Sequence, residues 1–328
     1  MSGPIDLSVV IPSYGTAAAT LACLDSLEAR RSEPTAEVLV IDNASPDDSA
    51  ARIRERHPGV RLIEQPRNLG FAAACNRGWR ESRGRAVLFL NSDTILAPDT
   101  LGDLLRALDA ERDVGAVGPR LTGRDGRLQP SCRRDPSPGA LLNQHTVVRH
   151  LRLFRRHERR YKMRDFAFDR RADVDVVMGA ALLVRREALE AVGALDEGFF
   201  MYFEEADLCR RLRDAGHRVV FDPSATLTHT GGESSRRAGA AIEAEYVRSL
   251  LRYVRRRAGP IGRLFPALFL PTWLVRRFEL LAQDVLGGAV ATLIGREAEA
   301  DRRWRGAVMG FELVTRRLFE VISGAFGT

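Results

Sequence analysis

An α/β fold is predicted for this 328-residue chain: a doubly wound, mostly parallel sheet followed by a helical C-terminal region. Two observations predict it. Short, nearly continuous apolar runs alternate with stripes of helical spacing through the first 110 residues, which is typical of strands buried between two helical layers. Beyond about residue 235 the pattern is helical to the end. We therefore expect a sheet domain over 1–235 and a helical region over 236–328.

In the first third of the chain, four apolar runs predict buried strands and three stripes predict helices. Ser45 and Pro46 have the residue types of a helix N-cap and first helical position, and predict a further helix start there. The expected strands span 7–12, 37–42, 60–64 and 86–90, and the expected helices cover 21–27, 71–80 and 101–108.

The middle of the chain is less regular. Residues 121–173 are rich in arginine and suit either a solvated loop with a helix or a contact for an anionic acceptor. A strand is expected over 174–184, with a break at Gly179–Ala181 that suggests close approach of a ligand or of neighbouring backbone. Two short strands are expected at 218–221 and 225–229.

Polar residues follow several of the expected strands: Tyr14, Asp42, Asp93 and His229. Sheets of this kind bind ligands at the carboxyl ends of their strands, so these four are candidates for a common site. The segment after the first strand lacks the G-x-G-x-x-G pattern of dinucleotide binding, which argues against a nicotinamide dehydrogenase.

Three carboxylates, Glu204, Glu205 and Asp207, open a further expected helix. Acids in a first turn are favoured by the helix dipole and need no other function. Here a run of aromatic residues precedes them, and a desolvated carboxylate can serve as a general base. Both interpretations remain open on the residue pattern alone.

The formal net charge of +7 indicates an anionic partner, namely a nucleotide phosphate, an anionic lipid surface or nucleic acid. No nucleic-acid recognition motif is present, so nucleic acid is not expected. The four scattered cysteines and the absence of a signal-peptide core predict a cytoplasmic protein, with the inner face of the cell membrane as a second location.

The expected membrane contact lies within 261–295. There the apolar run Leu264–Val275 carries two prolines, is flanked by arginines and is too short to span a bilayer. It suits an interfacial helix, or equally a helix packed on the main domain or on a second subunit of a homo-oligomer.

Taken together, six short motifs within residues 5–235 resemble family 2 of the inverting, GT-A-fold glycosyltransferases, most closely the bacterial rhamnosyltransferase-like branch. The GT-A fold is the Rossmann-like fold of nucleotide-diphospho-sugar transferases, so the resemblance implies that 1–235 is the catalytic domain. The motifs are Val9–Gly15, Val40–Ser45, Asn68–Gly78, Phe89–Asp93, Gly179–Arg186 and Phe200–Leu208.

The resemblance implies a role for each strand-end segment. Asp42 would bind the base of the nucleotide, and Asp93 and His229 would hold Mg²⁺ or Mn²⁺ on the diphosphate. Asn91 stands where the family has the first acid of its D-x-D motif. The other residues implied in donor, sugar or acceptor contact are Pro12, Tyr14, Asn68, Gly70, Asn76, Ser92, Gly179 and Ala180.

For the reaction, the resemblance implies that Glu205 takes the proton of the acceptor hydroxyl, with Asp207 as the alternative base and Glu204 in contact with a sugar. The donor would be dTDP-rhamnose or a UDP-sugar, and the acceptor a cell-envelope glycan or a polyprenyl-linked intermediate. Two alternatives stay open. One is a sugar nucleotidyltransferase, although Ser13–Gly15 is not the glycine-rich basic loop it needs. The other is a non-catalytic protein that binds nucleotide or glycan.

Overall fold

The computed structural model describes residues 5–29, 34–231 and 233–326. The chain forms two compact units, which we call the sheet unit (1–135 and 162–234) and the helical unit (136–161 and 235–328). Residues 136–161 therefore belong with the C-terminal helices, although they interrupt the sheet unit in sequence. Nothing in their residue pattern indicates this assignment.

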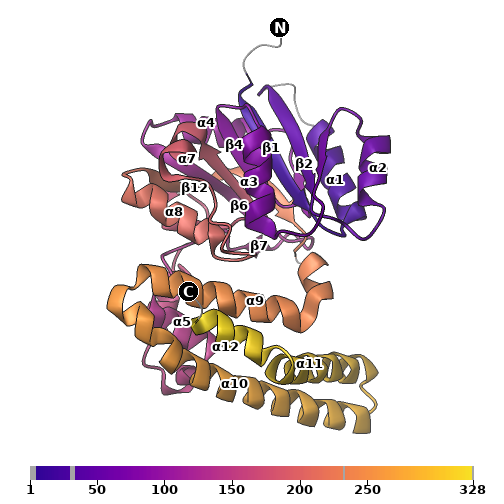
Figure 1. Ribbon diagram of the computed structural model, residues 1–328, viewed down its shortest axis with the longest axis vertical. Helices are drawn as coiled ribbons and strands as arrows, with labels where there is room; N and C mark the ends of the chain where they lie inside the picture. The colour runs from indigo at the N-terminus through magenta and orange to yellow at the C-terminus, as the bar shows by residue number, and fades with distance from the viewer. Residues whose placement is uncertain (1–4, 30–33, 232, 327–328) are drawn as a thin grey trace. The chain divides into compact units, whose positions relative to one another are not determined.

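The sheet unit is built on a ten-stranded mixed sheet (Figure 1). Its main strands are ordered β3 (Arg61–Glu64), β2 (Ala36–Asp42), β1 (Leu7–Ser13), β4 (Ala86–Leu90), β11 (Ala181–Arg185), β6 (Val114–Thr122), β12 (Arg218–His229) and β5 (Thr94–Leu96). The first four are mutually parallel, as are β6 and β12. Strand β11 runs antiparallel to both of its neighbours, and β5 runs antiparallel to β12. The sheet is thus mostly parallel, with one reversed strand at its centre.

Short strands extend this arrangement. Strand β7 (Leu128–Gln129) pairs with β6, and β9 (Ala172–Asp173) pairs with β12. Strands β8 (Cys132–Arg133) and β10 (Val176–Val177) form a separate two-stranded sheet.

Helices cover both faces of the sheet, which explains the continuous apolar runs. Side chains of β1 alternate between the two faces: Val9 joins a core cluster with Leu24 and Leu104, whereas Val10 packs beneath Gly78. A Cβ on Gly78 would lie 2.3 Å from the Val10 side chain, so only glycine allows this close helix–strand packing. The helices are α1 (Ala17–Glu28), α2 (Ser49–Arg56), α3 (Phe71–Glu81), α4 (Thr100–Asp109), α7 (Arg186–Val192) and α8 (Glu204–Asp214).

Three expectations about local structure are wrong. The strand expected over 174–184 is divided into β10 and β11, which belong to different sheets. Helix α2 begins at Ser49, not at Ser45 and Pro46, because the Ser45 hydroxyl is used elsewhere: it donates to the Asp42 carboxylate and accepts from the Gly15 N–H. The two short strands expected at 218–221 and 225–229 form the single strand β12, whose register against β6 shifts between Asp222 and Thr226.

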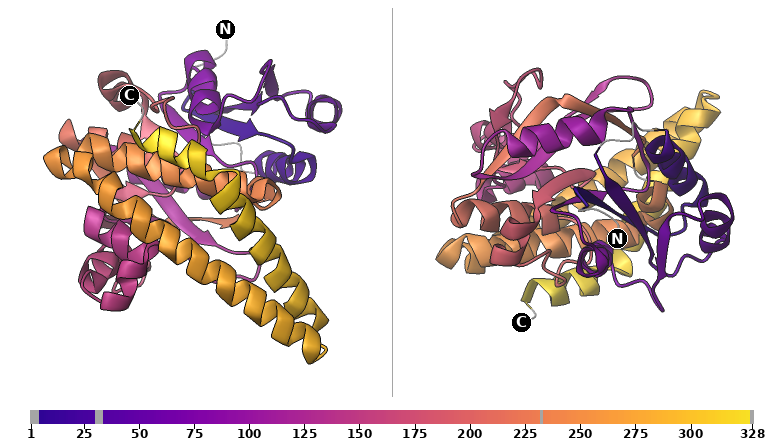
Figure 2. Two further views of the ribbon diagram at one scale, coloured as in Figure 1. Left: turned by 60° about the horizontal axis from the view of Figure 1, so that its bottom comes forward. Right: turned by 90° about the horizontal axis from the view of Figure 1, so that it is seen from above.

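The helical unit contains α5 (Pro138–His145), a 3₁₀ turn η1 (Val147–Leu151), α6 (Arg155–Tyr161), α9 (Glu233–Arg257), α10 (Gly259–Leu293), α11 (Glu297–Thr315) and α12 (Leu318–Phe326). Figure 2 shows α10 and α11 as a long helical hairpin. Phe265, Phe269 and Trp273 bury one side of α10, and both prolines of the apolar run lie inside this helix. Among the described residues, none of the helices is both long and apolar enough to span a bilayer.

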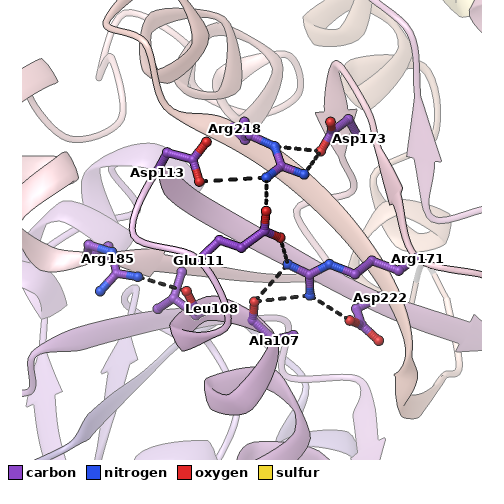
Figure 3. Close-up of polar contacts among 9 residues, drawn as sticks. All are labelled: Ala107, Leu108, Glu111, Asp113, Arg171, Asp173, Arg185, Arg218 and Asp222. Atoms are coloured by element: carbon purple, nitrogen blue, oxygen red, sulfur yellow. Dashed lines mark hydrogen bonds and ion pairs between the residues drawn. The ribbon is translucent and has the colours of Figure 1, made fainter.

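At the edge of the sheet where β6 and β12 begin, arginine side chains donate hydrogen bonds to the C-terminal end of α4 (Figure 3). Arg171 donates to the Ala107 carbonyl at 3.1 and 3.2 Å, and Arg185 donates to the Leu108 carbonyl at 2.7 Å. These carbonyls lie in the last turn of the helix and have no partner within it. Arg171 also contacts Asp222 at 2.9 Å, and Glu111 joins Arg171 to Arg218.

We expect Arg171→Met to lower the free energy of unfolding by about 1–3 kcal/mol, because the Ala107 carbonyl and the Asp222 carboxylate both lose a charged donor. Chemical denaturation followed by circular dichroism measures the change. Arg112→Met is the matched control, since Arg112 is exposed beside the same helix end. Equal stability of the two variants would show that the arginine cluster does not hold α4.

Candidate active site

Strand register brings the candidate residues to one edge of the sheet. Asp42 pairs with Ser13 where β1 and β2 end. At the end of β4, Leu90 pairs with Ala181, the first residue of the reversed strand β11. His229 ends β12 opposite Thr94. The segments after β1, β2, β4 and β12, and the segment before β11, therefore share this edge.

Asp42 is buried and holds the turn that follows β2. Its carboxylate accepts from the Ser45 N–H at 3.2 Å and from the Ser45 hydroxyl, and Ala44 between them has a positive φ of 61°. Tyr14, at the end of the neighbouring strand, is 42% exposed, whereas Pro12 is buried within β1. The Tyr14 side chain is thus partly exposed at this edge.

Asn43, which lies in the motif Val40–Ser45 but was given no role, joins this turn to the next. Its Nδ2 donates to Asn68 Oδ1 at 2.9 Å and to the Gly70 carbonyl at 3.1 Å, and its Oδ1 accepts from the Leu69 N–H. Gly70 has a φ of 89°, and a Cβ there would lie 2.4 Å from the Phe200 carbonyl oxygen. Glycine is required at this position both by the backbone conformation and by the close approach of residue 200.

Asn76 is buried in α3 and faces the segment that precedes α8. Its Nδ2 donates to the Leu195 carbonyl at 2.8 Å and to Glu197 at 2.9 Å, and its Oδ1 accepts from the Leu195 N–H at 3.0 Å. The amide is thus occupied by protein groups. We assign Asn76 the role of positioning the loop that leads to the acids, rather than that of touching the nucleotide.

Asp93 and His229 are in direct contact. Asp93 Oδ1 lies 3.3 Å from His229 Nε2, and the two side chains are 12% and 10% exposed. Two ligands so close can bind one ion, since metal–ligand bonds measure about 2.0–2.2 Å. Within the described part of the chain, no cluster of three or more His, Cys, Asp or Glu forms a metal site. An ion held here would take its other ligands from solvent or substrate, as Mg²⁺ commonly does with phosphates.

Gln129, in β7, orients the His229 ring. Its Oε1 lies 3.1 Å from His229 Nδ1 and can accept the proton on that nitrogen. The lone pair of His229 is then on Nε2, the atom that faces Asp93 and lies 3.4 Å from Asn91 Nδ2. The Asp93 carboxylate is the type of ligand that Mn²⁺ and Mg²⁺ prefer, and the His229 imidazole is a type of ligand that transition metals bind. No motif pointed to Gln129, because the strand pairing of β7 with β6 brings it here.

Ser92 is buried and contacts Thr16 through its hydroxyl at 3.2 Å. Thr16 in turn contacts Thr20 at 3.3 Å, and the Asn91 carbonyl accepts from the Thr94 hydroxyl at 2.7 Å. These buried hydroxyls hold the segment 91–93, which carries Asp93, in place. Ser92 therefore contributes to the site by holding this segment in position.

Glu204 and Glu205 begin α8 after a strained turn. Tyr202 and Phe203 have positive φ values of 71° and 67°. Bulky side chains rarely adopt this backbone conformation, which costs about 1–3 kcal/mol for each residue and is concentrated at functional sites. The turn before α8 is held to the start of α3, because the Phe71 N–H donates to the Phe200 carbonyl at 2.7 Å.

Burial raises the pKa of Glu205, and the first-turn N–H groups and the charge of Arg133 offset this only in part. Among the described residues, its Oε2 is buried without a hydrogen-bond partner. A Cβ built on Gly179 would lie 3.6 Å from the Cβ of Glu205. The carbonyl of the next residue, Ala180, accepts from the Asn91 N–H at 2.9 Å. Glu205 is thus connected to the segment 91–93 by a single intervening turn.

Asp207 is separate from the other two acids in its bonding. It is fully buried and paired with Arg211 at 2.8 Å, and Arg211 also donates to the carbonyls of Val192, Gly193 and Ala194. This ion pair holds α8 to the end of α7. We therefore assign Asp207 a structural role and keep Glu205 as the candidate base, with Glu204 beside Gly179.

Comparisons with known proteins show the family and the fold of this chain. A family model described as glycosyl transferase family 2 matches residues 8–193. The N-acetylglucosaminyl-diphospho-decaprenol L-rhamnosyltransferase of Mycobacterium tuberculosis is 32% identical over 256 residues, which cover 74% of this chain and 82% of that protein. The low-salt glycan biosynthesis hexosyltransferase Agl10 of Haloferax volcanii is 26% identical over 63% of this chain and 62% of its own.

Among solved structures, the mannosyltransferase PcManGT from Pyrobaculum calidifontis, in complex with GDP-Man and Mn²⁺, has a TM-score of 0.57 at 20% sequence identity. The match covers 99% of this chain and 88% of that one. GalNAc-T7 with UDP, GalNAc and Mn²⁺ has a TM-score of 0.52 at 16% identity, over 68% of this chain and 43% of that one. These likenesses show the α/β fold of GT-A glycosyltransferases.

The raised pKa of Glu205 predicts a pH-dependent gain in stability for Glu205→Gln. A carboxyl whose pKa is raised in the folded state binds a proton more tightly there than in the unfolded chain, so its cost is absent below the unfolded pKa of about 4.3, grows as the pH rises toward the folded pKa and is constant above it. We expect the variant to melt above the native protein at pH 7–8, with the difference vanishing below about pH 4. Glu190→Gln, at an exposed position of α7, is the control. A difference independent of pH would contradict the burial of this charge.

Gln129→Leu is expected to weaken Mn²⁺ binding about 10- to 100-fold, the usual effect of removing an outer partner of a metal-binding histidine. Isothermal titration with Mn²⁺ and a nucleoside diphosphate measures this without turnover. Gln283→Leu, in the helical unit, controls for the substitution itself. Unchanged Mn²⁺ affinity would remove Gln129 from the site.

Proposed function

The chain belongs to glycosyl transferase family 2, and we propose that it transfers a sugar with inversion, from dTDP-rhamnose or a UDP-sugar to a hydroxyl of a lipid-linked or cell-envelope glycan. Transfer from a nucleotide-sugar donor follows from the family. The observation that carries the proposed mechanism is the contact of Asp93 with His229 at the same sheet edge as Glu205, whose Oε2 is buried without a partner among the described residues.

We assign the donor to the part of the edge formed by the ends of β1, β2 and β4. Asp42 and the exposed Tyr14 ring would hold the base there, and Asp93 and His229 would hold Mn²⁺ or Mg²⁺ on the diphosphate. When bound, such an ion neutralises negative charge that develops on the leaving diphosphate. Asn91 adds an uncharged amide at this point, so the protein supplies one carboxylate in place of two.

Glu205 has the properties of a general base in a single displacement. Its raised pKa increases its affinity for a proton, and its unpaired Oε2 can accept the hydrogen of an acceptor hydroxyl. As the proton passes to Glu205, the acceptor oxygen bonds to the anomeric carbon of the sugar. The bond from that carbon to the diphosphate breaks, and the electron pair leaves with the nucleoside diphosphate.

The donor and acceptor are proposed from the relatives. The mycobacterial relative is named for transfer of L-rhamnose to N-acetylglucosaminyl-diphospho-decaprenol. We propose the same chemical classes for this chain: a deoxyhexose donor and a sugar on a polyprenyl diphosphate.

We expect Glu205→Gln to lower kcat about 10²- to 10⁴-fold while the donor Kd changes little, because the amide cannot accept the proton and lies apart from the nucleotide contacts. The assay measures nucleoside diphosphate released from dTDP- and UDP-sugars with Mn²⁺ and a short-chain N-acetylglucosaminyl-diphospho-polyprenol. Glu190→Gln should retain full activity, and chelation of Mn²⁺ should abolish it.

The products separate the alternatives. Pyrophosphate as the product would show a sugar nucleotidyltransferase, and donor binding without any product would show a non-catalytic protein. Near-normal turnover of Glu205→Gln would overturn the assignment of the base.

A further inference from the structure

The outward side of α10 is apolar along nearly its whole length. Its exposed large side chains recur at intervals of three, four, seven or eight residues, the spacings that keep them on one helical face. Leu264 is 73% exposed, Phe278 is 52% exposed and Leu293 is 84% exposed. The exposed large side chains of this stripe are Ile261, Leu264, Leu268, Val275, Phe278, Leu286 and Leu293. At 1.5 Å per residue, the stripe extends over about 50 Å.

This exposed stripe is distinct from the face by which α10 packs into its own unit. Phe265, Phe269 and Trp273 are buried on the inner side, so the helix already contributes its share to the core of the helical unit. Helices α11 and α12 expose further large side chains, among them Trp304, Val308, Phe311 and Phe319. A protein surface in water rarely carries so many large exposed apolar side chains along one helix unless it binds something.

Charge is divided unequally between the two units. The helical unit has 22 arginines against 10 Asp and Glu, a net charge of +12, whereas the sheet unit carries a net charge of −5. Among the described residues, at least seven of those ten carboxylates contact an arginine within the unit. The surplus is therefore cationic side chains, such as the exposed Arg263, Arg302 and Arg305.

These two properties select one kind of partner. A second copy of the helical unit would bring one charge of +12 against another, and like charges resist such a contact. Burial across a bilayer is excluded for the described helices, none of which can span one. An anionic lipid surface satisfies both properties, because the acyl boundary accepts the apolar stripe and the headgroups attract the arginines.

We propose that the helical unit docks on an anionic membrane surface, with the apolar stripe of α10 lying at the boundary between headgroups and acyl chains. Docking would hold the protein where a polyprenyl-linked sugar is displayed. The inference itself rests on the exposed stripe and the charge of this unit, and it stands whether or not the proposed transfer reaction is correct.

The test is flotation of the full chain with vesicles of phosphatidylcholine alone or mixed with phosphatidylglycerol. We expect binding to the mixed vesicles at low salt, much weaker binding to neutral ones, and loss of most binding at high salt. Leu268→Gln with Phe278→Gln should weaken binding at least about tenfold. Arg302→Gln with Arg305→Gln should weaken it about fivefold for each arginine, on anionic vesicles only.

Arg52→Gln with Arg112→Gln, two exposed arginines of the sheet unit, should bind as the unchanged protein does. Light scattering on the same samples reports the oligomeric state. Failure to bind anionic vesicles at low salt would overturn the proposal. It would also be overturned by a dimer that the α10 double variant dissociates without any change in vesicle binding.

Discussion

The reversed direction of β11 is the constraint on which the site depends. Because this strand runs antiparallel between β4 and β6, it begins at the edge where β4 ends. Gly179 and Ala180 therefore lie beside the segment 91–93, and the Asn91 N–H donates a hydrogen bond to the Ala180 carbonyl. A parallel strand at this position would place the glycine turn at the far edge, away from both Asp93 and Glu205.

Four side-chain or backbone links then hold separate loops in a fixed arrangement. Asn43 joins the turn after β2 to Asn68 and Gly70, and the Phe200 carbonyl joins that segment to the strained turn before α8. Asn76 fastens the loop in between, and the ion pair of Asp207 with Arg211 fixes α8 itself. The strain at Tyr202 and Phe203 and the buried charge of Glu205 both reduce stability, and the surrounding contacts offset that cost.

The sequence predicted strands β1 to β4, helices α1, α3, α4 and α8, and the residues at the strand ends, because buried runs and helical stripes are local signals. Local signals could not predict the direction of β11, because that direction depends on the neighbouring strands. They also could not predict the role of Gln129, because only the pairing of β7 with β6 brings it to His229. They also could not distinguish Asp207 from Glu205. Both are acids of one first turn, and only the position of Arg211 one turn later, with its carbonyl partners, identifies the paired one. The placement of residues 136–161 with the C-terminal helices likewise follows from tertiary packing.

The most direct measurement is anomalous diffraction at the manganese absorption edge, from crystals grown with Mn²⁺ and a nucleoside diphosphate. The account predicts one strong anomalous peak within bonding distance of Asp93 and His229, with the diphosphate as a further ligand and the Glu205 carboxylate facing the same ligand. Manganese bound elsewhere, or a diphosphate with Glu205 turned away from it, would contradict the account.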